Sequence, residues 1–575
     1  MDNKEFFSTV KQRRVKPIFR FLFLILILIL AGCGVSGLFS LFSDGDGNAF
    51  QGKGKEEKAI SAATKWETGY LSAATAEVEY VDETGSVLGT LPRGAKVHFE
   101  TSDDGKIRIL ADKVIGVLSG AAVVSDPAEV IPAQTLYVRT AVNLRDQNGK
   151  LLSTFLDKGF ALEITGCDYT DSTGNPHMYR ARTGDGEGYV LPWYLTDTEE
   201  NALANFDSGS YRIHADRKDR YGGGDAGSLD YFPREKAPIE GNQMPEECRT
   251  LYVAARRVEA IDDYISLAQK SGINAFVVDI ADGGAIGYAA DVMKTYCPSG
   301  AVHAANTVEE YKAAIQKLKS AGFYVIGRIT TFNDTYFVKD HPECAIADPS
   351  GAPLTLHGAF WPTAFSRTAW QYKVDLAAEA AELMGFHEIQ FDYVRFPDRT
   401  SSYEKKGTIN FRNAHGETKA QAIQRFLMYA TDILHEKGVY VSADVYGESA
   451  YTYVTAYGQY WPAISGVVDA ISGMPYPDHF GASGNWLPWE HPYETLNDWG
   501  KKVMLRQDET ENPAVVRTWI QAYNAIRQPY NKYGPAEISA QIRGLRDAGC
   551  TGGFITWNAS ASLSKYTEIS SAFSS

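Results

Sequence analysis

The chain has 575 residues, a net charge of −15 and an ordinary composition, with 44% hydrophobic and 22% charged residues. Domains with a single hydrophobic core usually have about 100 to 200 residues. The chain is longer than that, and we expect roughly three domains. The negative net charge disfavours nonspecific binding of nucleic acid, and no nucleic-acid partner is expected.

The N-terminal region predicts a membrane anchor. An uncharged run at 21–42 follows five basic residues, Lys11, Arg13, Arg14, Lys16 and Arg20. A run of this length can span a bilayer, and the basic flank places the N-terminus in the cytoplasm. Residues 1–42 are therefore interpreted as a cytoplasmic basic segment and a signal-anchor transmembrane helix.

A second kind of anchor is open within the same run. Leu30-Ala31-Gly32-Cys33 resembles the lipobox of bacterial lipoprotein signals, and this resemblance implies cleavage and lipidation of Cys33. The residues after Cys33 stay apolar through Phe42, which favours the uncleaved helix. Both interpretations attach the protein to the cell membrane, single-pass or by a lipid, with its body outside the cytoplasm.

Two small all-β units are expected after the anchor. Residues 43–65 are rich in Gly, Ser and charge and are interpreted as a linker. Short alternating runs separated by turns then predict one unit at 66–126 and another at 133–197.

The second unit, with Val142-Asn-Leu-Arg145 and Gly186-Glu-Gly-Tyr-Val190, resembles bacterial SH3-like domains, and its turn-glycine pattern repeats that of the first unit. The resemblance implies that these units bind cell-wall peptide or glycan. The alternative is that they act as spacers.

The C-terminal part predicts a parallel α/β barrel. Residues 198–245 are rich in Gly and charge and are interpreted as a linker, and helical and strand patterns alternate over 246–575. Eight strands are expected, at 250–255, 274–280, 323–330, 386–394, 439–445, 468–474, 515–521 and 552–557. Eight alternating units favour a (β/α)₈ TIM barrel over an open doubly wound sheet. No G-x-G-x-x-G or G-x-x-x-x-G-K-[ST] motif follows a strand, so the usual nucleotide-binding signatures are missing.

The fourth expected strand carries the densest polar set. Because strand side chains alternate between two faces, Gln390 and Asp392 point one way and Ile389 and Phe391 the other. Arg395 follows closely. One face of this strand is therefore predicted to pack in the core and the other to carry chemistry.

Polar and aromatic residues also end the other strands, and the C-terminal strand ends of a barrel converge on one mouth. Beside Gln390, Asp392 and Arg395, we expect in this mouth Asp279, Asp282, Arg328, Asp334, Asp444, Glu448, Tyr476, His479, Trp519, Gln521 and Trp557. Carboxylates, an arginine and aromatic platforms in one cleft suit a sugar, because glycosidic cleavage uses two carboxyl groups and an oxocarbenium-like transition state.

Asp392 is the expected nucleophile or base, because an arginine within reach would hold its carboxylate ionised. Asp444 is the expected partner acid, with Glu448 as the alternative acid, and the remaining residues are expected to bind substrate. A lone aspartate at a strand end is often a helix cap or a turn residue, and this is the alternative for Asp279 and Asp334.

No catalytic metal and no other cofactor is expected. The histidines show no H-E-x-x-H spacing and the six cysteines no C-x-x-C spacing. A metal-dependent deacetylase or an esterase is disfavoured by the missing metal spacing and the missing G-x-S-x-G elbow.

The barrel region resembles a bacterial family of unknown-function domains assigned to the glycoside hydrolases. The resemblance is carried by the motif Phe391-Asp-Tyr-Val-Arg-Phe-Pro397 and by segments 324–332, 442–447, 474–479 and 517–521. The resemblance covers about residues 248–570 and implies a TIM barrel of glycosidase type. The chain departs from the family at 279–282, where a lysine often precedes the second acid.

The sequence therefore predicts a membrane-anchored, extracytoplasmic glycoside hydrolase. It would cleave O-glycosidic bonds of a polysaccharide of the cell envelope by a two-carboxylate mechanism. The competing interpretation is a non-catalytic cell-wall or carbohydrate-binding protein whose barrel keeps a sugar cleft. The carboxylates on the fourth and fifth strands favour the enzyme.

Overall fold

The computed structural model of the protein describes residues 66–111, 113–206, 209, 211 and 226–574. The predicted membrane anchor, Cys33 and the linker at 43–65 lie outside the described residues. Among the helices that are described, none combines the length and the apolar composition that a membrane span requires.

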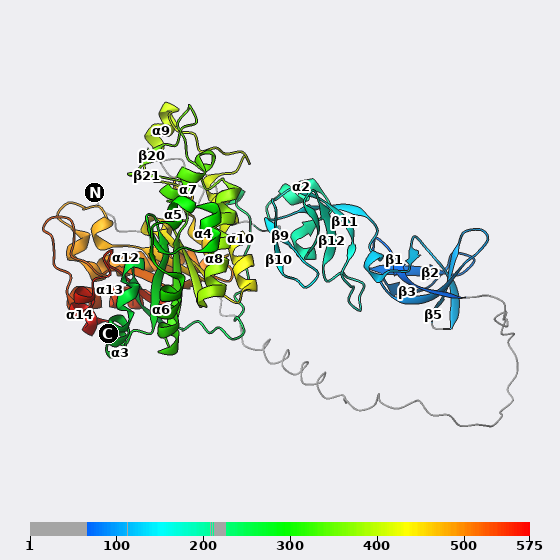
Figure 1. Ribbon diagram of the computed structural model, residues 1–575, viewed down its shortest axis with the longest axis horizontal. Coiled ribbons are helices and arrows are strands. Elements are labelled where there is room, and N and C mark those ends of the chain that lie inside the picture. Colours follow the sequence, from blue (N-terminus) through cyan, green and yellow to red (C-terminus); the bar gives the residue numbers. More distant parts are fainter. Residues whose placement is uncertain (1–65, 112, 207–208, 210, 212–225, 575) are drawn as a thin grey trace, which may run out of the picture. The chain divides into compact units, whose positions relative to one another are not determined.

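The predicted N-terminal all-β region is present and consists of two antiparallel sheets (Figure 1). The first sheet has the order β3-β2-β6-β5-β4-β1-β7, with β1 (Glu67–Ser72), β2 (Glu77–Val81), β3 (Val87–Pro92), β4 (Lys96–Thr101), β5 (Ile107–Ala111), β6 (Val114–Leu118) and β7 (Ala122–Val124). The second has the order β10-β9-β13-β12-β11-β8-β14, with β8 (Gln134–Val138), β9 (Val142–Arg145), β10 (Leu151–Leu156), β11 (Ala161–Cys167), β12 (Tyr179–Thr183), β13 (Gly186–Val190) and β14 (Leu195–Thr196).

Each of these sheets has a small hydrophobic core of its own. Leu71 and Ile109 are fully buried in the first, and Leu162 and Ile164 in the second. The SH3-like character of the two units and the domain boundaries drawn from the sequence stay predictions.

The C-terminal part forms a near-closed parallel barrel, which fits the predicted (β/α)₈ architecture (Figure 1). Its strands are β15 (Cys248–Val253), β16 (Ala275–Asp282), β19 (Tyr324–Thr330), β22 (Glu388–Asp392), β23 (Tyr440–Tyr446), β24 (Ala470–Met474), β25 (Val515–Val516), β26 (Thr518–Gln521) and β27 (Gly553–Trp557). β25 and β26 together occupy one strand position of the barrel, because β25 pairs with β24 and β26 pairs with β27. Arg517 lies between them and donates its backbone N–H to the Ile471 carbonyl at 3.0 Å, which extends the pairing with β24.

Helices connect the strands and cover the outside of the barrel (Figure 1). They are α3 (Ile261–Ser271), α4 (Asp291–Tyr296), α5 (Pro298–Ala301), α6 (Val308–Ser320), α7 (Thr335–Asp340), α8 (Arg367–Met384), α9 (Ser401–Lys406), α10 (Lys419–Glu436), α11 (Trp461–Ser465), α12 (Pro492–Asp508), α13 (Pro535–Asp547) and α14 (Leu563–Ile569). α2 (Glu199–Leu203) precedes the barrel, and the short strands β17 (Ala285–Tyr288), β18 (Ala304–Asn306), β20 (Thr355–Leu356) and β21 (Ala359–Phe360) belong to its loops.

The glycine that follows a helix in the sequence pattern ends that helix in the structure. Gly272 after α3 and Gly385 after α8 both have a φ of 73°, in the left-handed region. A residue with a Cβ atom is strained there, whereas glycine turns the chain towards the next strand at little cost.

The fourth barrel strand is shorter than the predicted 386–394. Tyr393 has a φ of 49°, so the extended conformation of β22 ends directly after Asp392. This break fixes Asp392 as the last residue of its strand.

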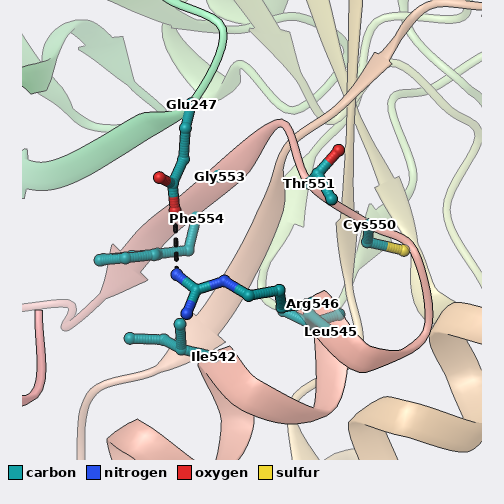
Figure 2. A pocket seen from close by; sticks show the side chains of 8 residues that line it. All are labelled: Glu247, Ile542, Leu545, Arg546, Cys550, Thr551, Gly553 and Phe554. Carbon is teal, nitrogen blue, oxygen red and sulfur yellow. Dashed lines mark hydrogen bonds and ion pairs between the residues drawn. The ribbon is translucent and has the colours of Figure 1, made fainter. Parts of the chain in front are cut away.

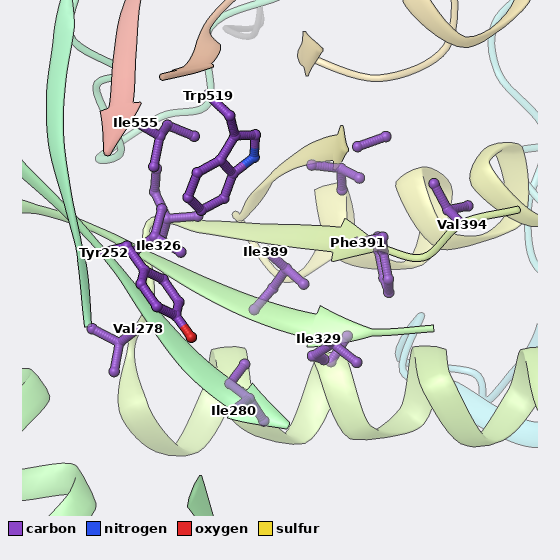
Figure 3. Close-up of a cluster of buried hydrophobic side chains, with 14 of the residues drawn as sticks. Tyr252, Val278, Ile280, Ile326, Ile329, Ile389, Phe391, Val394, Trp519 and Ile555 are labelled. Atoms are coloured by element: carbon purple, nitrogen blue, oxygen red, sulfur yellow. The ribbon is translucent and has the colours of Figure 1, made fainter. Parts of the chain in front are cut away.

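The predicted alternation along β22 is confirmed. The Phe391 ring packs at 5.3 Å from the Phe426 ring of α10, among the buried apolar side chains that Figure 3 draws. Gln390 points the other way and donates from Nε2 to Ser472 Oγ at 3.3 Å. Ser472 lies on β24, which is not a neighbour of β22, so this hydrogen bond crosses the barrel interior.

Described residues of the segment at 198–245 contribute to the core of the barrel. Phe206 and Phe232 are buried with their ring centroids 4.8 Å apart. Asn242 donates from Nδ2 to the backbone carbonyls of His387 and Gly438 at 2.8 and 2.9 Å, next to the beginnings of β22 and β23.

A buried ion pair lies at the N-terminal end of the barrel interior. Glu388 of β22 accepts hydrogen bonds from Arg517 Nη1 at 2.8 Å and from Tyr324 OH at 3.0 Å, and both charged side chains are fully buried. Ser442 Oγ donates to the same carboxylate at 2.5 Å. Three strands and the β25–β26 junction are thereby joined through one carboxylate.

Near the same end of the barrel, an exposed ion pair crosses a small cavity of about 250 Å³ (Figure 2). Glu247 Oε1 and Arg546 Nη2 are 3.3 Å apart, with 35% and 46% of their side-chain surfaces exposed. Water screens such a pair, so it contributes about 1 kcal/mol or less to stability.

Replacing Glu388 by Gln is expected to lower the free energy of unfolding by about 3 to 5 kcal/mol, because the Arg517 charge then stays buried without a counter-charge. Denaturant unfolding followed by tryptophan fluorescence measures the loss. Glu247→Gln is the matched control and should cost about 1 kcal/mol or less. Equal losses in the two variants would show that the buried pair does not hold the barrel together.

Candidate active site

Arg328 of β19 lies at the centre of the acidic cluster in the mouth of the barrel. Its side chain is 1% exposed, and Nη1 lies 2.7 Å from Asp279 Oδ1 while Nη2 lies 2.5 Å from Asp392 Oδ2. Asp282 Oδ1 lies 3.3 Å from Nη1, and Asp444 Oδ2 lies 3.8 Å from Nε. The structure thus brings together five predicted site residues from β16, β19, β22 and β23 around one guanidinium.

Asp392 accepts hydrogen bonds on both of its carboxylate oxygens. Oδ2 accepts from Arg328 Nε at 3.2 Å as well as from Nη2, and Oδ1 accepts from the backbone N–H of Tyr393 at 2.5 Å. Charge-assisted hydrogen bonds of this kind favour the carboxylate over the protonated acid. The left-handed conformation of Tyr393 accompanies this backbone contact.

Asp444 has the opposite environment. It is fully buried, Oδ1 accepts from Trp519 Nε1 at 2.7 Å, and among the described residues Oδ2 has no hydrogen-bond partner. Burial, followed by the charge of Asp392, raises the pKa of Asp444 well above its usual range. Burial therefore favours the protonated form of Asp444, next to the carboxyl group of Asp392.

Asp279 and two aromatic rings form another wall of the cluster. Tyr252 OH donates to Asp279 Oδ2 at 2.5 Å, and the Tyr252 and Trp557 ring centroids are 4.9 Å apart. The guanidinium carbon of Arg328 lies 5.5 Å from the Trp557 centroid. Burial raises the pKa of Asp279 to about 7, so this carboxyl group changes charge near neutral pH.

Comparison with known proteins assigns the barrel to a family. The family model described as "Putative glycosyl hydrolase domain" matches residues 250–563, more than half of the chain. The chain belongs to this family. The assignment drawn from the Phe391–Pro397 motif is confirmed by this match.

Solved structures resemble parts of this glycosyl hydrolase family member. A hypothetical protein from Ruminiclostridium thermocellum ATCC 27405 is 31% identical over 34% of this chain and 97% of its own, with a TM-score of 0.29. The glycoside hydrolase domain of PgaB (BpsB) from Bordetella bronchiseptica is 13% identical over 57% of this chain and 99% of its own, with a TM-score of 0.40.

The chitobiase of Flavobacterium johnsoniae is 12% identical over 57% of this chain and 47% of its own, with a TM-score of 0.38. No curated protein matches the chain in sequence.

Three predicted binding residues of the glycosyl hydrolase domain lie outside the cluster. Asp334 caps α7, where Oδ1 accepts from the Phe337 N–H at 2.9 Å, and its other oxygen pairs with Lys373 at 2.7 Å. Gln521 hydrogen-bonds to backbone groups of 478 and 523, and Gln390 bonds to Ser472 below the acids. Their contacts in the structure are with the protein itself.

Four other predicted residues surround or adjoin a large cavity at the strand ends. Glu448 and His479 line this cavity, whose volume is about 1100 Å³. Arg395 donates from Nη2 to Tyr446 OH at 2.5 Å, and its guanidinium carbon lies 4.3 Å from the Tyr446 ring centroid. Tyr476 is buried with its ring 5.1 Å from that of His479.

Sequence reasoning missed the tyrosines of this glycosyl hydrolase site. Tyr252 is the second-last residue of β15, and Tyr446 is the last residue of β23. Their position at strand ends is the signal that could have found them, as it found the acids. As for metals, no group of three or more His, Cys, Asp and Glu side chains suited to an ion occurs in the part of the chain that the structure describes.

Asp279→Asn is expected to change how stability depends on pH. The pKa of Asp279 is about 7 in the folded protein, against its usual 3.8, so folding favours the protonated form. That stabilisation is complete below about pH 3.8 and is lost as the pH rises to about 7, whereas Asn stays neutral throughout.

The melting temperature of Asp279→Asn relative to the wild type should therefore rise between pH 4 and pH 7, roughly the interval between the two pKa values. Calorimetry at several pH values measures this difference. Asp291→Asn, on the surface of α4, is the control for replacing an exposed aspartate. A difference that falls with pH would mean that Asp279 is charged throughout.

Proposed function

We propose that the protein is a glycoside hydrolase that cleaves O-glycosidic bonds of a polysaccharide with Asp392 and Asp444. The observation that carries the proposal is the contrast between two neighbouring acids. Arg328 and the Tyr393 N–H donate charge-assisted and backbone hydrogen bonds to Asp392, whereas burial favours the protonated form of Asp444. Glycosidic cleavage requires this division, one carboxyl group to give a proton and another to attack or to activate water.

In the proposed mechanism, Asp444 donates its proton to the glycosidic oxygen as the bond to the anomeric carbon breaks. The electron pair of that bond leaves with the oxygen. Asp392 either forms a bond to the anomeric carbon, which water later hydrolyses, or removes a proton from the water that attacks it. A carboxyl separation of about 5 Å in a substrate complex would favour the first route and about 6.5 to 9.5 Å the second.

The surrounding residues support the same chemistry. Arg328 offsets part of the negative charge of the cluster, so that Asp392 remains charged in a buried site. The Trp519 indole N–H fixes the orientation of the Asp444 carboxyl group. Trp557 beside Arg328 offers an aromatic face to a sugar ring.

We further propose that the substrate belongs to the cell envelope. The apolar run at 21–42 and its basic flank support an anchor in the cell membrane, by a helix or through Cys33, with the barrel outside the cytoplasm. The two β units, by their resemblance to SH3-like domains, would bind cell-wall peptide or glycan and hold the barrel near its substrate.

Asp392→Asn is expected to lower turnover by roughly 10³-fold or more, because Asn keeps the size of the side chain and removes the charge that attacks or activates water. The wild type and the variant are compared on a panel of soluble and wall-derived polysaccharides by release of reducing ends. Asp291→Asn is the control and should keep wild-type rates.

Asp444→Asn tests the acid in the same assay. The turnover of this variant should fall most on substrates with poor leaving groups and little on activated aryl glycosides, because only a poor leaving group needs the proton. If Asp444→Asn is silent, Glu448 is the acid instead. If the wild type binds glycans and cleaves none, the protein is a carbohydrate-binding protein.

Trp519→Phe is expected to shift the pH dependence of kcat/KM. The Trp519 hydrogen bond lowers the pKa of Asp444, against the larger upward effect of burial, so losing the donor raises this pKa further. Activity that needs protonated Asp444 is lost as pH rises through its pKa, and the basic limb of the profile should move to higher pH.

Trp461→Phe is the matched control, because Trp461 is equally buried and its Nε1 donates to Gln507 instead. This variant should leave the basic limb where it is. A downward shift in Trp519→Phe, or equal shifts in both variants, would contradict the role of Asp444 as the acid.

A further inference from the structure

The large cavity lies at the same ends of the barrel strands as the acidic cluster. It is formed by loops after β22, β23 and β24 and by part of the loop after β26, and its lining includes Tyr446 and Met474, the last residues of β23 and β24. Tyr446 lies two positions after Asp444 on the same strand. Arg395, three positions after Asp392, packs its guanidinium against the Tyr446 ring. The two acids and the cavity are therefore joined through Tyr446 and Arg395.

The volume of this cavity, about 1100 Å³, exceeds the need of a single sugar ring. Sites that enclose a whole drug-sized molecule have volumes of about 300 to 1000 Å³. The reaction at Asp392 and Asp444 occupies one glycosidic bond. Asp392 and Asp444 do not line this cavity, so its space is available to further sugar units on one side of that bond.

Tyrosines provide the wall that a chain of sugars would use. Tyr451 and Tyr453 line the cavity, half-buried, with their rings parallel within 4° and their centroids 5.9 Å apart. Aromatic faces of this kind can pack against the apolar C–H faces of sugar rings.

Glu448 is fixed in the same wall with capacity to accept more hydrogen bonds. Its two carboxylate oxygens accept from Tyr453 OH and Tyr457 OH, both at 2.9 Å. A carboxylate has about four acceptor positions, so two such contacts leave others for sugar hydroxyl or amide donors.

The charges of the cavity lining balance. Asp398 and Glu448 are matched by Arg399 and Arg527. A lining without net charge favours an uncharged ligand over a polyanion.

We propose that this cavity binds at least two consecutive uncharged sugar rings of a polysaccharide, stacked on Tyr451 and Tyr453 and hydrogen-bonded to Glu448, so that the protein cleaves internal glycosidic bonds. This inference rests on the proposed function, because it assigns the neighbouring part of the same substrate chain. Beyond that function, it specifies that the cleaved bonds are internal to the polysaccharide and that the bound sugars are uncharged.

The binding test uses the full chain carrying Asp392→Asn, so that ligands stay intact. Uncharged oligosaccharides of chitin, cellulose, xylan and β-1,3-glucan, with one to six units, are titrated by calorimetry beside oligogalacturonates of equal length. In at least one uncharged series, the affinity should rise roughly tenfold or more between one and four sugar units. Oligogalacturonates of the same length should bind more weakly than that series.

Substitutions of Tyr451 and Glu448 test whether the cavity causes the gain in affinity with oligosaccharide length. Adding Tyr451→Ala or Glu448→Gln should remove most of the gain in affinity with length, about tenfold. Tyr493→Ala is the matched control, because Tyr493 lies on the outside of the barrel on α12 and its OH donates to Asp547. Affinity that does not rise with length in any series, or that the wall variants leave intact, overturns the inference.

Product analysis with the wild type separates this inference from the proposed function. Early release of fragments of several units from a polymer supports cleavage of internal bonds, whereas release of single sugars from the chain end overturns it and leaves glycoside hydrolysis intact. Length-dependent binding without any cleavage would instead contradict the proposed hydrolase and leave the cavity assignment standing.

Discussion

The guanidinium of Arg328 contacts carboxyl groups from three neighbouring strands, and the chemistry of the barrel mouth depends on this arrangement. Its charge is buried, so it needs close acidic partners. Yet one cation cannot offset four acids in a site of low polarity. Asp392 accepts two hydrogen bonds from this guanidinium, while burial raises the pKa of Asp279 and Asp444. An acid and a base therefore arise from residues of the same type.

The same alternation of side chains produces both the stability and the site. Outward residues of β22 such as Phe391 pack against α10, and inward residues form polar layers along the barrel axis. Glu388 pairs with Arg517 at one end, Gln390 bonds across the middle, and Asp392 meets Arg328 at the mouth. A shift of this strand by one residue would expose every polar group to the apolar layer and remove the site at once.

Much of this arrangement could be predicted from the sequence, because strand alternation and strand ends are local properties. They give the barrel strands, the inward direction of Asp392 and the gathering of Asp279, Arg328 and Asp444. What depends on distant neighbours could not be predicted. The ion pair of Asp334 with Lys373 of α8 and the hydrogen bond from Tyr252 to Asp279 each join residues far apart in the sequence, and no local pattern predicts these partners. Protonation likewise depends on burial, which no spacing of residues reveals.

We infer that Asp444 is protonated next to a charged Asp392 in the resting protein. Infrared difference spectroscopy between the wild type and Asp444→Asn at neutral pH tests it without a substrate. The account predicts that the substitution removes a carbonyl band of a protonated carboxyl group and leaves the carboxylate bands in place, whereas Asp392→Asn removes carboxylate bands. Loss of carboxylate bands in Asp444→Asn, with the protonated carbonyl band intact, would contradict it.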